Sequence, residues 1–314
     1  MYCPYFRGKQ FELITIRETA KLMADAGFVP IIEPVKEALK GLGKALQAIC
    51  ENQGRAIVIV NPYYGDHQDD GADITKLLQD DYKGDDKISA GILLRSSMSL
   101  DLGKAAYQEH EGHNPTFVHA GFTSQKELAQ YLGSALPASQ HVFIEGHANT
   151  LYRKHFDGSK RILIRDGFKR NKNAEYAKLP LEEFSELHLT YASDLNMDGF
   201  GDFLIVGDSY SDSGGPAYAV AIHLTFIDPA KDDVMYVYHF VSSTNDTPTD
   251  PAGKFAQALK KLIDKLNTGD SKLVETQAIK EFRDLHSKGH FPGLGYVKKL
   301  SMKHHIETLA GYLG

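Results

Sequence analysis

Residues 56–61 read AIVIVN and residues 141–145 read HVFIE, and these two stretches decide the fold class. Each is a run of β-branched and other apolar residues that ends in a polar side chain. Neither run alternates between apolar and polar positions. Such runs are typical of strands that are buried on both faces, as in a parallel sheet covered by helices. The sequence therefore indicates an α/β protein.

Similar runs recur along the chain, with helical patterns between them. The predicted strands are residues 2–7, 28–33, 56–61, 89–95, 116–119, 141–145, 161–166 and 202–208. Leucine and isoleucine recur at helical spacing in 37–50, and a similar stripe is found in 254–266. Ser124 and Glu127 match a capping box at the start of another helix.

Eight strand-like segments with helical crossovers favour a (β/α)8, TIM-barrel-like fold. An open doubly wound sheet is the alternative, although no G-x-G-x-x-G follows the first strand. Residues 218–227 and 234–241 predict an antiparallel β-hairpin that follows or completes the eighth unit. We expect one barrel domain over 1–314, with a loop and hairpin excursion at 209–250 and C-terminal helices at 252–314 packed on the barrel.

Composition excludes several classes of protein. The net charge is −6 over 314 residues, which argues against a basic protein that grips duplex DNA. No run of about 18 apolar residues predicts a membrane span, and the first residues lack the pattern of a signal peptide. A disulfide between Cys3 and Cys50 is one option, but two scattered thiols fit a reducing cytoplasm better. We therefore expect a cytoplasmic protein without membrane contact.

Polar side chains stand where the predicted strands end. In a barrel these ends surround the active site. The candidate catalytic residues are Glu33, His119, Glu145 and Asp166, and the candidate ligand-binding residues are Arg7, Lys9, Asn61, Arg95 and Asp208.

This mixture of charges suits an anionic ligand. Arginine forks bind phosphate or carboxylate oxygens, and carboxylates bind Mg²⁺ or move protons. His119 is the candidate acid or base, and His147 follows Glu145 at the same end. A charged ring without chemistry is the alternative.

Asp194, Asn196, Asp198 and Asp202 follow the spacing D-x-N-x-D-G-x-x-D. Short oxygen-bearing side chains around a glycine turn are typical of a Ca²⁺ loop. Position twelve is Ile205 rather than the glutamate of an EF-hand, and the motif occurs once. An Asx-rich turn is the alternative.

Two further motifs attract attention. Asp212-Ser213-Gly214-Gly215-Pro216 looks like a serine-protease nucleophile segment, but the α/β pattern and the lack of a matching histidine segment argue for a shaped loop. Residues 298–307 read KKLSMKHHIE, which offers phosphate contacts or a metal ligand; a solvated helix end is the simpler interpretation.

The opening residues 2–13, YCPYFRGKQFEL, followed by PIIEP at 30–34, resemble a little-characterised bacterial group called the "beta" protein family. GDF at 201–203, SGGPAYAVAIH at 213–223 and GLGYVKKLS at 293–301 resemble one subgroup, which is usually encoded beside a second small protein. The resemblance implies a bacterial, cytoplasmic, barrel-like protein near prophage or phage-defence genes. It implies no reaction.

Two functions remain open. The first is a barrel that binds or hydrolyses an anionic phosphoester or nucleotide, with Mg²⁺ or Ca²⁺ as candidate cofactors; enzymatic activity stays undecided. The second is a non-catalytic subunit that works with a neighbouring gene product, docking through the hairpin and the C-terminal helices. Duplex DNA binding ranks third because only residues 298–305 are locally basic.

Overall fold

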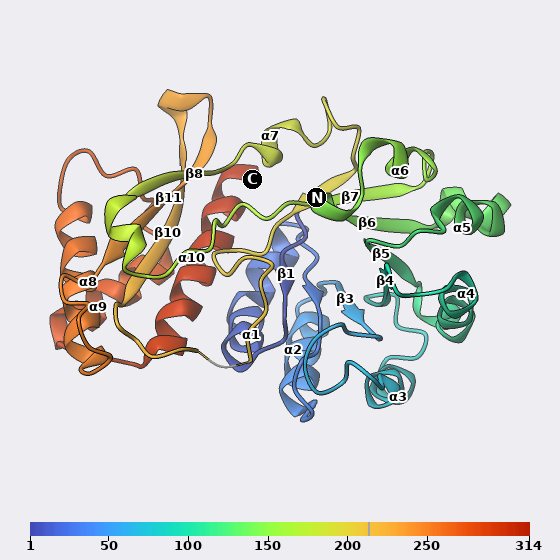
Figure 1. Cartoon of the computed structure of the whole chain (residues 1–314), viewed down its shortest axis with the longest axis horizontal. Coiled ribbons are helices and arrows are strands. Elements are labelled where there is room, and N and C mark those ends of the chain that lie inside the picture. The colour runs from blue at the N-terminus through green and yellow to red at the C-terminus, as the bar shows by residue number, and fades with distance from the viewer. Residues whose placement is uncertain (213) are drawn as a thin grey trace. The chain divides into compact units, whose positions relative to one another are not determined.

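A parallel sheet of eight strands forms the centre of the first of two compact units (Figure 1). The computed structural model describes residues 1–212 and 214–314. The first unit comprises Met1–Asp166 and Thr190–Phe203. Its strands, in sheet order, are β1 (Tyr5–Phe6), β2 (Ile31–Ile32), β3 (Ala56–Ile59), β4 (Ile88–Arg95), β5 (Thr116–Ala120), β6 (Gln140–Ile144), β7 (Lys160–Ile164) and β9 (Gly199–Gly201).

Backbone hydrogen bonds bring the two edges of this sheet together. The Cys3 N–H donates to the Phe200 carbonyl at 2.8 Å, and the Tyr5 N–H donates to the Asp202 carbonyl at 2.9 Å. The sheet is therefore a nearly closed parallel barrel. This confirms the predicted α/β class and eight-stranded barrel, and it overturns the open doubly wound alternative.

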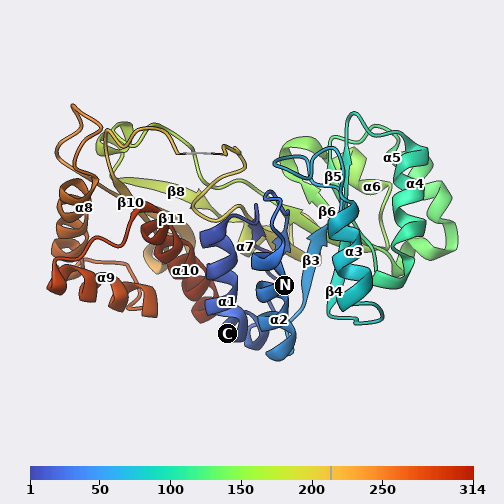
Figure 2. The same cartoon turned by 90° about the horizontal axis from the view of Figure 1, so that it is seen from below.

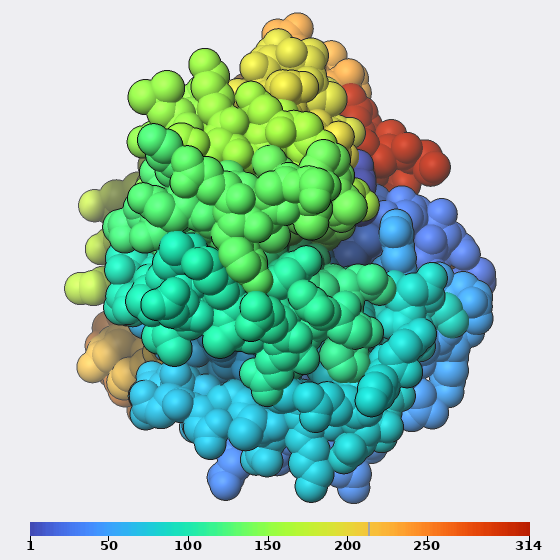
Figure 3. Space-filling view, turned by 90° about the vertical axis from the view of Figure 1, so that its right-hand side faces the viewer, coloured from blue at the N-terminus to red at the C-terminus, as the bar shows by residue number. Residues whose placement is uncertain are grey.

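Helices cover the outside of the barrel (Figures 1 and 2). They are α1 (Gln10–Asp25), α2 (Lys40–Glu51), α3 (Ala72–Asp81), α4 (Leu100–Glu109), α5 (Gln125–Leu132) and α6 (Thr150–Lys154). In Figure 3 the units from α3 to α6 follow one another in colour order, from cyan to green, across the outer face. Each βα unit therefore lies beside its neighbour in sequence, as the right-handed crossover of parallel strands requires.

Alternate residues of each strand fill the barrel interior. Ile57 and Ile59 of β3 belong to this interior cluster, as do Val142 and Ile144 of β6, whereas Val58 points to the helical layer. Because side chains alternate along a strand, this parity also decides which strand-end residues face the barrel axis.

The eighth strand lies earlier than the apolar pattern predicts. Residues 202–208 were the predicted strand, but the structure pairs Gly199–Gly201 with β7, with Ile164 opposite Gly201. Residues 204–206 form a turn instead. The prediction was wrong here because the glycine-rich strand is defined by pairing on both sides and carries little apolar signal.

The second unit comprises Gly167–Leu189 and Leu204–Gly314. It contains an antiparallel sheet in the order β10 (Ala221–Asp228), β11 (Val234–Val241) and β8 (Leu181–Ser185). The predicted hairpin is β10–β11, but it belongs to this separate sheet and does not complete the eighth barrel unit. The short helix α7 (Leu187–Thr190) follows β8.

Three C-terminal helices complete this unit: α8 (Pro251–Leu266), α9 (Gln277–Lys288) and α10 (Leu294–Leu313). Helices α8 and α10 pack on the sheet, and α9 packs on α8 and α10. Ile222 and Leu224 of β10 share one buried core with Phe255 of α8, Phe282 of α9 and Leu300 of α10. Full burial of each such side chain contributes about 1.5–3 kcal/mol. The predicted packing of these helices on the barrel stays a prediction.

The basic stretch of α10 is not a solvated helix end. Lys299, His304 and His305 are buried. His304 Nε2 donates to the Thr225 carbonyl at 2.9 Å, and His305 Nδ1 lies 2.9 Å from the Thr225 hydroxyl. The prediction was wrong because partners about 80 residues away in the sequence satisfy these side chains.

Two smaller expectations also change. Ser124 precedes α5 as expected, but its side chain accepts no hydrogen bond, so the predicted capping box is not formed. Cys3 is buried and Cys50 is half-buried, and both are free thiols. Burial raises the pKa of Cys3 to about 12, which keeps that thiol protonated and unreactive.

Candidate functional site at the carboxyl end of the barrel

Arg7 and Glu33 form an ion pair where β1 and β2 end. Both side chains are buried. The Tyr5 hydroxyl donates to Glu33 Oε2 at 2.8 Å, and the Tyr63 backbone N–H donates to Glu33 Oε1 at 2.7 Å. Both carboxylate oxygens of Glu33 are thus engaged, so this carboxylate holds three strand ends together.

Aromatic rings enclose the Arg7 guanidinium. Its Cζ lies 4.9 Å from the ring centres of Tyr5 and Tyr64, and 5.2 Å from that of Phe203. The Arg7 backbone N–H donates to Glu12 at 2.5 Å. The cation–π contacts and the ion pair together fix the orientation of the Arg7 guanidinium. Arg7 is therefore a rigid structural element.

Arg95 ends β4. Among residues 1–212 and 214–314, its buried Nε–H donates to no acceptor, and no carboxylate forms an ion pair with it as Glu33 does with Arg7. Its Cζ lies 5.1 Å from the ring centre of Tyr63, whose side chain is half exposed. Arg95 is therefore a positive charge that the fold holds in place without neutralising it.

The ends of β5, β6 and β7 continue this rim. A Cβ built on Gly121 would lie 3.7 Å from His147 Nδ1 and 3.6 Å from Ser96 Cβ, which places the three segments side by side. Arg165 grips Glu145 with two hydrogen bonds, Nε to Oε2 at 2.6 Å and Nη2 to Oε1 at 2.9 Å. This pair is bidentate and partly buried.

Consecutive strand ends are therefore joined by contacts. The structure brings together Arg7, Glu33 and Arg95 through Tyr63. Glu145 lies on the rim with His147. The two carboxylates are each balanced by an arginine, which leaves Arg95 as a cation without a counter-charge in this set.

The alternation of side chains along each strand explains which predicted residues face the barrel axis. Arg7, Glu33, Asn61 and Arg95 each stand two residues beyond an interior side chain of their strand, and Tyr5 and Leu93 are two of those. The Asn61 side chain, however, is hydrogen-bonded to the backbone of the neighbouring strand β4. Its amide donates to the Leu93 carbonyl at 3.0 Å and accepts from the Leu93 N–H at 2.8 Å.

His119 does not join the rim. It follows the interior residue Val118, so its ring points to the helical layer, where it is fully buried. His119 stacks on Phe143 and Phe156. Burial lowers the pKa of His119 well below its usual value, with His141 adding to the effect. The location predicted for His119 was wrong. The last residue of β5 that faces the barrel axis is Ala120, and His119 beside it faces the opposite way.

Both ring nitrogens of His119 belong to a chain of hydrogen bonds in which each donor direction is fixed by the one before it. The Ser139 hydroxyl donates to the Leu136 carbonyl, so it accepts from His141 Nε2 at 2.8 Å. His141 Nδ1 must then accept from His119 Nε2 at 2.9 Å, and His119 Nδ1 accepts from the Tyr152 hydroxyl at 2.7 Å. Every donor has an acceptor with both rings neutral, as hydrogen-bond accounting requires.

The structure also places the other predicted site residues. Asp166 is exposed just beyond β7, and Lys9 is half-buried and precedes α1. Asp208 belongs to the second unit. The Ser213 motif falls on a residue outside the described ranges.

Two carboxylates of the predicted Ca²⁺ loop accept hydrogen bonds from other residues of the protein. Asp198 accepts from the Arg161 N–H at 2.7 Å, and Asp202 accepts from the Tyr2 hydroxyl at 2.8 Å, while Asp194 and Asn196 are exposed. Among residues 1–212 and 214–314, no three His, Cys, Asp or Glu side chains gather as metal ligands. Metal binding by this loop stays a prediction.

Sequence reasoning missed three contributors to the rim: Tyr63, Tyr64 and Arg165. Arg165 directly follows β7, and the two tyrosines come four and five residues after the end of β3. The pair of tyrosines after a predicted strand was the sequence pattern that could have indicated the rim, but the same pattern is also typical of a turn.

Comparisons with protein-family models, curated proteins and solved structures find no match to this chain. In the part of the chain that the structure describes, no helix is both long and apolar enough to cross a membrane.

Proposed function

We propose that the barrel binds a small phosphorylated ligand at its carboxyl end, with Arg95 as the anchoring cation and Tyr63 as a stacking surface. The observation that carries this proposal is the Arg95 guanidinium, which is held over Tyr63 with its Nε buried and unpaired. Arginine presents five N–H donors in a planar fork that matches phosphate oxygens.

The neighbouring charges support an anion over a cation. Glu33 is neutralised by Arg7 and Glu145 by Arg165, so neither carboxylate opposes an incoming phosphate. The Tyr63 side chain is 51% exposed and offers a flat aromatic face beside the cation. A nucleotide, which combines phosphate with a stacking base, is the ligand class that uses both features.

Thermal melting with inorganic phosphate and with nucleoside monophosphates tests this proposal. A ligand at about a hundred times its dissociation constant adds about 2.7 kcal/mol of stability, which raises the melting temperature by several degrees. We expect this rise for the wild-type protein and for Arg55→Ala, which removes the same charge just before β3 at the opposite end. We expect Arg95→Ala to abolish it. An unchanged rise in Arg95→Ala excludes Arg95 as the anchor.

Hydrolysis of the bound phosphoester is a second candidate. It is supported by His147, an exposed imidazole beside Gly121 and Ser96 at the same end of the barrel. An imidazole beside a bound phosphoester can serve as a general acid or base. Release of inorganic phosphate from nucleotides, measured for the wild-type protein and for His147→Ala, tests this step. Release that His147→Ala leaves unchanged rules out the imidazole.

A cytoplasmic role in phage defence beside a neighbouring gene product is supported by the family resemblance of the opening and closing segments. Co-purification of the neighbouring protein, with and without the β10–β11 hairpin, tests that proposal. A complex that persists after the hairpin is replaced by a short loop removes the hairpin as the docking element.

A further inference from the structure

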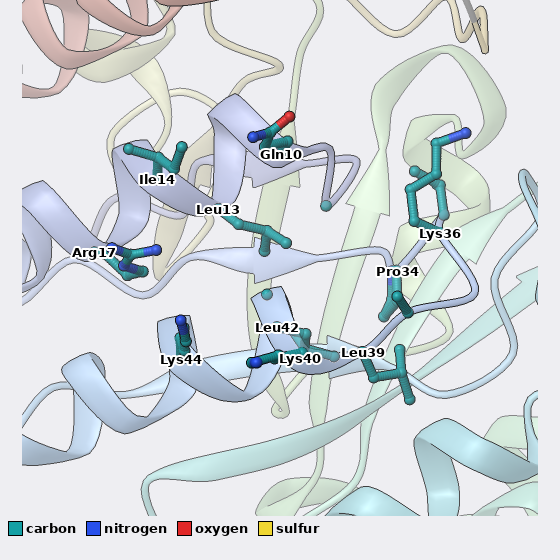
Figure 4. A pocket seen from close by; sticks show the side chains of 14 residues that line it. Gln10, Leu13, Ile14, Arg17, Pro34, Lys36, Leu39, Lys40, Leu42 and Lys44 are labelled. Carbon is teal, nitrogen blue, oxygen red and sulfur yellow. The ribbon is translucent and has the colours of Figure 1, made fainter.

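A pocket lies outside the barrel, between α1 and α2 (Figure 4). Its volume is about 340 Å³, within the range of small-molecule sites. Leu13 and Ile14 of α1 line one side, and Leu39 and Leu42 line the other. None of the residues that line it belongs to the rim described above.

Glycine at position 41 allows α1 and α2 to approach closely beside the pocket. α2 begins Lys40-Gly-Leu-Gly-Lys44, and a Cβ on Gly41 would lie 3.1 Å from Leu13 Cδ1. That distance is already tight, so a side chain at position 41 would crowd Leu13 at the pocket.

The charged side chains around this pocket have one sign. Arg17, Lys36, Lys40 and Lys44 line it, and no carboxylate is among its described lining residues. In the described part of the chain, Arg17, Lys40 and Lys44 form no ion pair. Figure 4 shows Arg17 of α1 across from Lys44 of α2 at one end, with Lys36 at the other end.

We propose that this pocket binds an amphipathic anion, with a carboxylate or phosphate head and a short apolar tail. The leucines and Ile14 supply an apolar wall for the tail, and the three unpaired cations supply the charge for the head. The N-terminus of α2, at Leu39 to Gly41, adds its positive helix dipole. Neither a purely apolar nor a purely ionic ligand uses both halves of the lining.

Isothermal titration with decanoate and decyl phosphate tests the proposal, with decanol and acetate as probes that lack the charge or the tail. We expect the wild-type protein to bind at least one of the two amphipathic anions and neither control probe. The ratio of the two affinities identifies the preferred head group. Binding of decanol as tight as that of the anions overturns the proposal, and so does the absence of binding by both anions.

Matched variants assign the binding to this pocket. Lys40→Glu/Lys44→Glu is expected to weaken binding at least about tenfold, which corresponds to about 1.4 kcal/mol. The control Lys76→Glu/Lys126→Glu reverses two exposed lysines on α3 and α5 and is expected to bind as the wild-type protein does. Leu39→Ser is expected to weaken binding through the tail. Equal affinity in the Lys40/Lys44 variant overturns the assignment.

The two anion sites are separable by experiment. Arg95→Ala is expected to lose the effect of inorganic phosphate on melting and to keep its affinity for decanoate. Lys40→Glu/Lys44→Glu is expected to show the reverse. Loss of decanoate binding in Arg95→Ala contradicts a pocket that is independent of the barrel rim.

Discussion

His119 and His141 show how a titratable side chain becomes part of a core. Each ring has two hydrogen-bond partners and lies among aromatic side chains. Because a neutral imidazole has one donor and one acceptor nitrogen, the chain from Tyr152 to Ser139 is satisfied only when both rings are uncharged. Burial disfavours the charged form as well. The two effects act in the same direction.

His119→Phe is expected to destabilise the protein by about 2–6 kcal/mol. Phenylalanine keeps the stacking, but the Tyr152 hydroxyl and His141 Nδ1 lose their partner, at about 1–3 kcal/mol for each buried group. Urea unfolding followed by circular dichroism measures the change. Binding of phosphate at the barrel rim should stay as in the wild-type protein.

His147→Phe serves as the control, since this side chain is exposed. We expect its unfolding free energy to lie within about 0.5 kcal/mol of the wild-type value. A stable His119→Phe variant that has lost ligand binding would return His119 to the functional site.

At the scale of single elements, β9 decides whether the barrel closes. Gly201 pairs with Ile164 of β7, and its missing side chain faces the segment before β1. A Cβ there would lie 2.0 Å from the Cys3 carbonyl oxygen and 2.5 Å from Ile164 Cδ1. Glycine is thus required by the close approach of two strands, which is a known reason for glycine within a sheet.

Gly201→Ala is expected to lower the unfolding free energy by about 3 kcal/mol, the upper part of the range for overpacked cores. The clash is with backbone, which has little freedom to move aside. Gly146→Ala is the matched control, because a Cβ at that exposed position meets nothing within 4 Å. A Gly201→Ala variant as stable as Gly146→Ala would show that the strand junction can shift.

At the scale of the whole molecule, buried neutral histidines in both units make stability depend on pH. Burial lowers the pKa of His141 in the first unit to about 3 and that of His304 in the second unit to about 4. Their ordinary value is about 6.5. At a pH between the folded and the ordinary pKa values, the unfolded chain binds more protons than the folded chain. Acid therefore favours unfolding.

We expect the free energy of unfolding to be highest above pH 6.5 and to fall as the pH drops toward 4. Between pH 6.5 and pH 5, each of the two histidines contributes a loss of roughly 2 kcal/mol, since one pKa unit corresponds to about 1.4 kcal/mol. Urea titrations at pH 7 and pH 5 measure the difference. Circular dichroism is the suitable probe, because the chain has no tryptophan.

His304→Phe is expected to reduce this pH dependence in the second unit, even where it also lowers stability overall. The slope with pH, and not the absolute stability, is the relevant readout. Equal unfolding free energies at pH 7 and pH 5 for the wild-type protein would mean that these rings accept protons without leaving the folded state.

The sequence by itself determined the α/β class, seven of the eight barrel strands and the hairpin, because these segments carry their own apolar runs or turns. It also located Arg7, Glu33 and Arg95 at strand ends, since a polar residue that ends an apolar run is a local signal.

Tertiary structure alone decided the rest. Gly199–Gly201 is a strand because two neighbours pair with it, and His119 lies in a core because strand parity turns it from the axis. The basic stretch of α10 is buried because Thr225 and Glu281 come from distant segments to satisfy it. Partners that are far apart in the chain leave no trace in a local pattern, and only the folded chain brings them within hydrogen-bond distance.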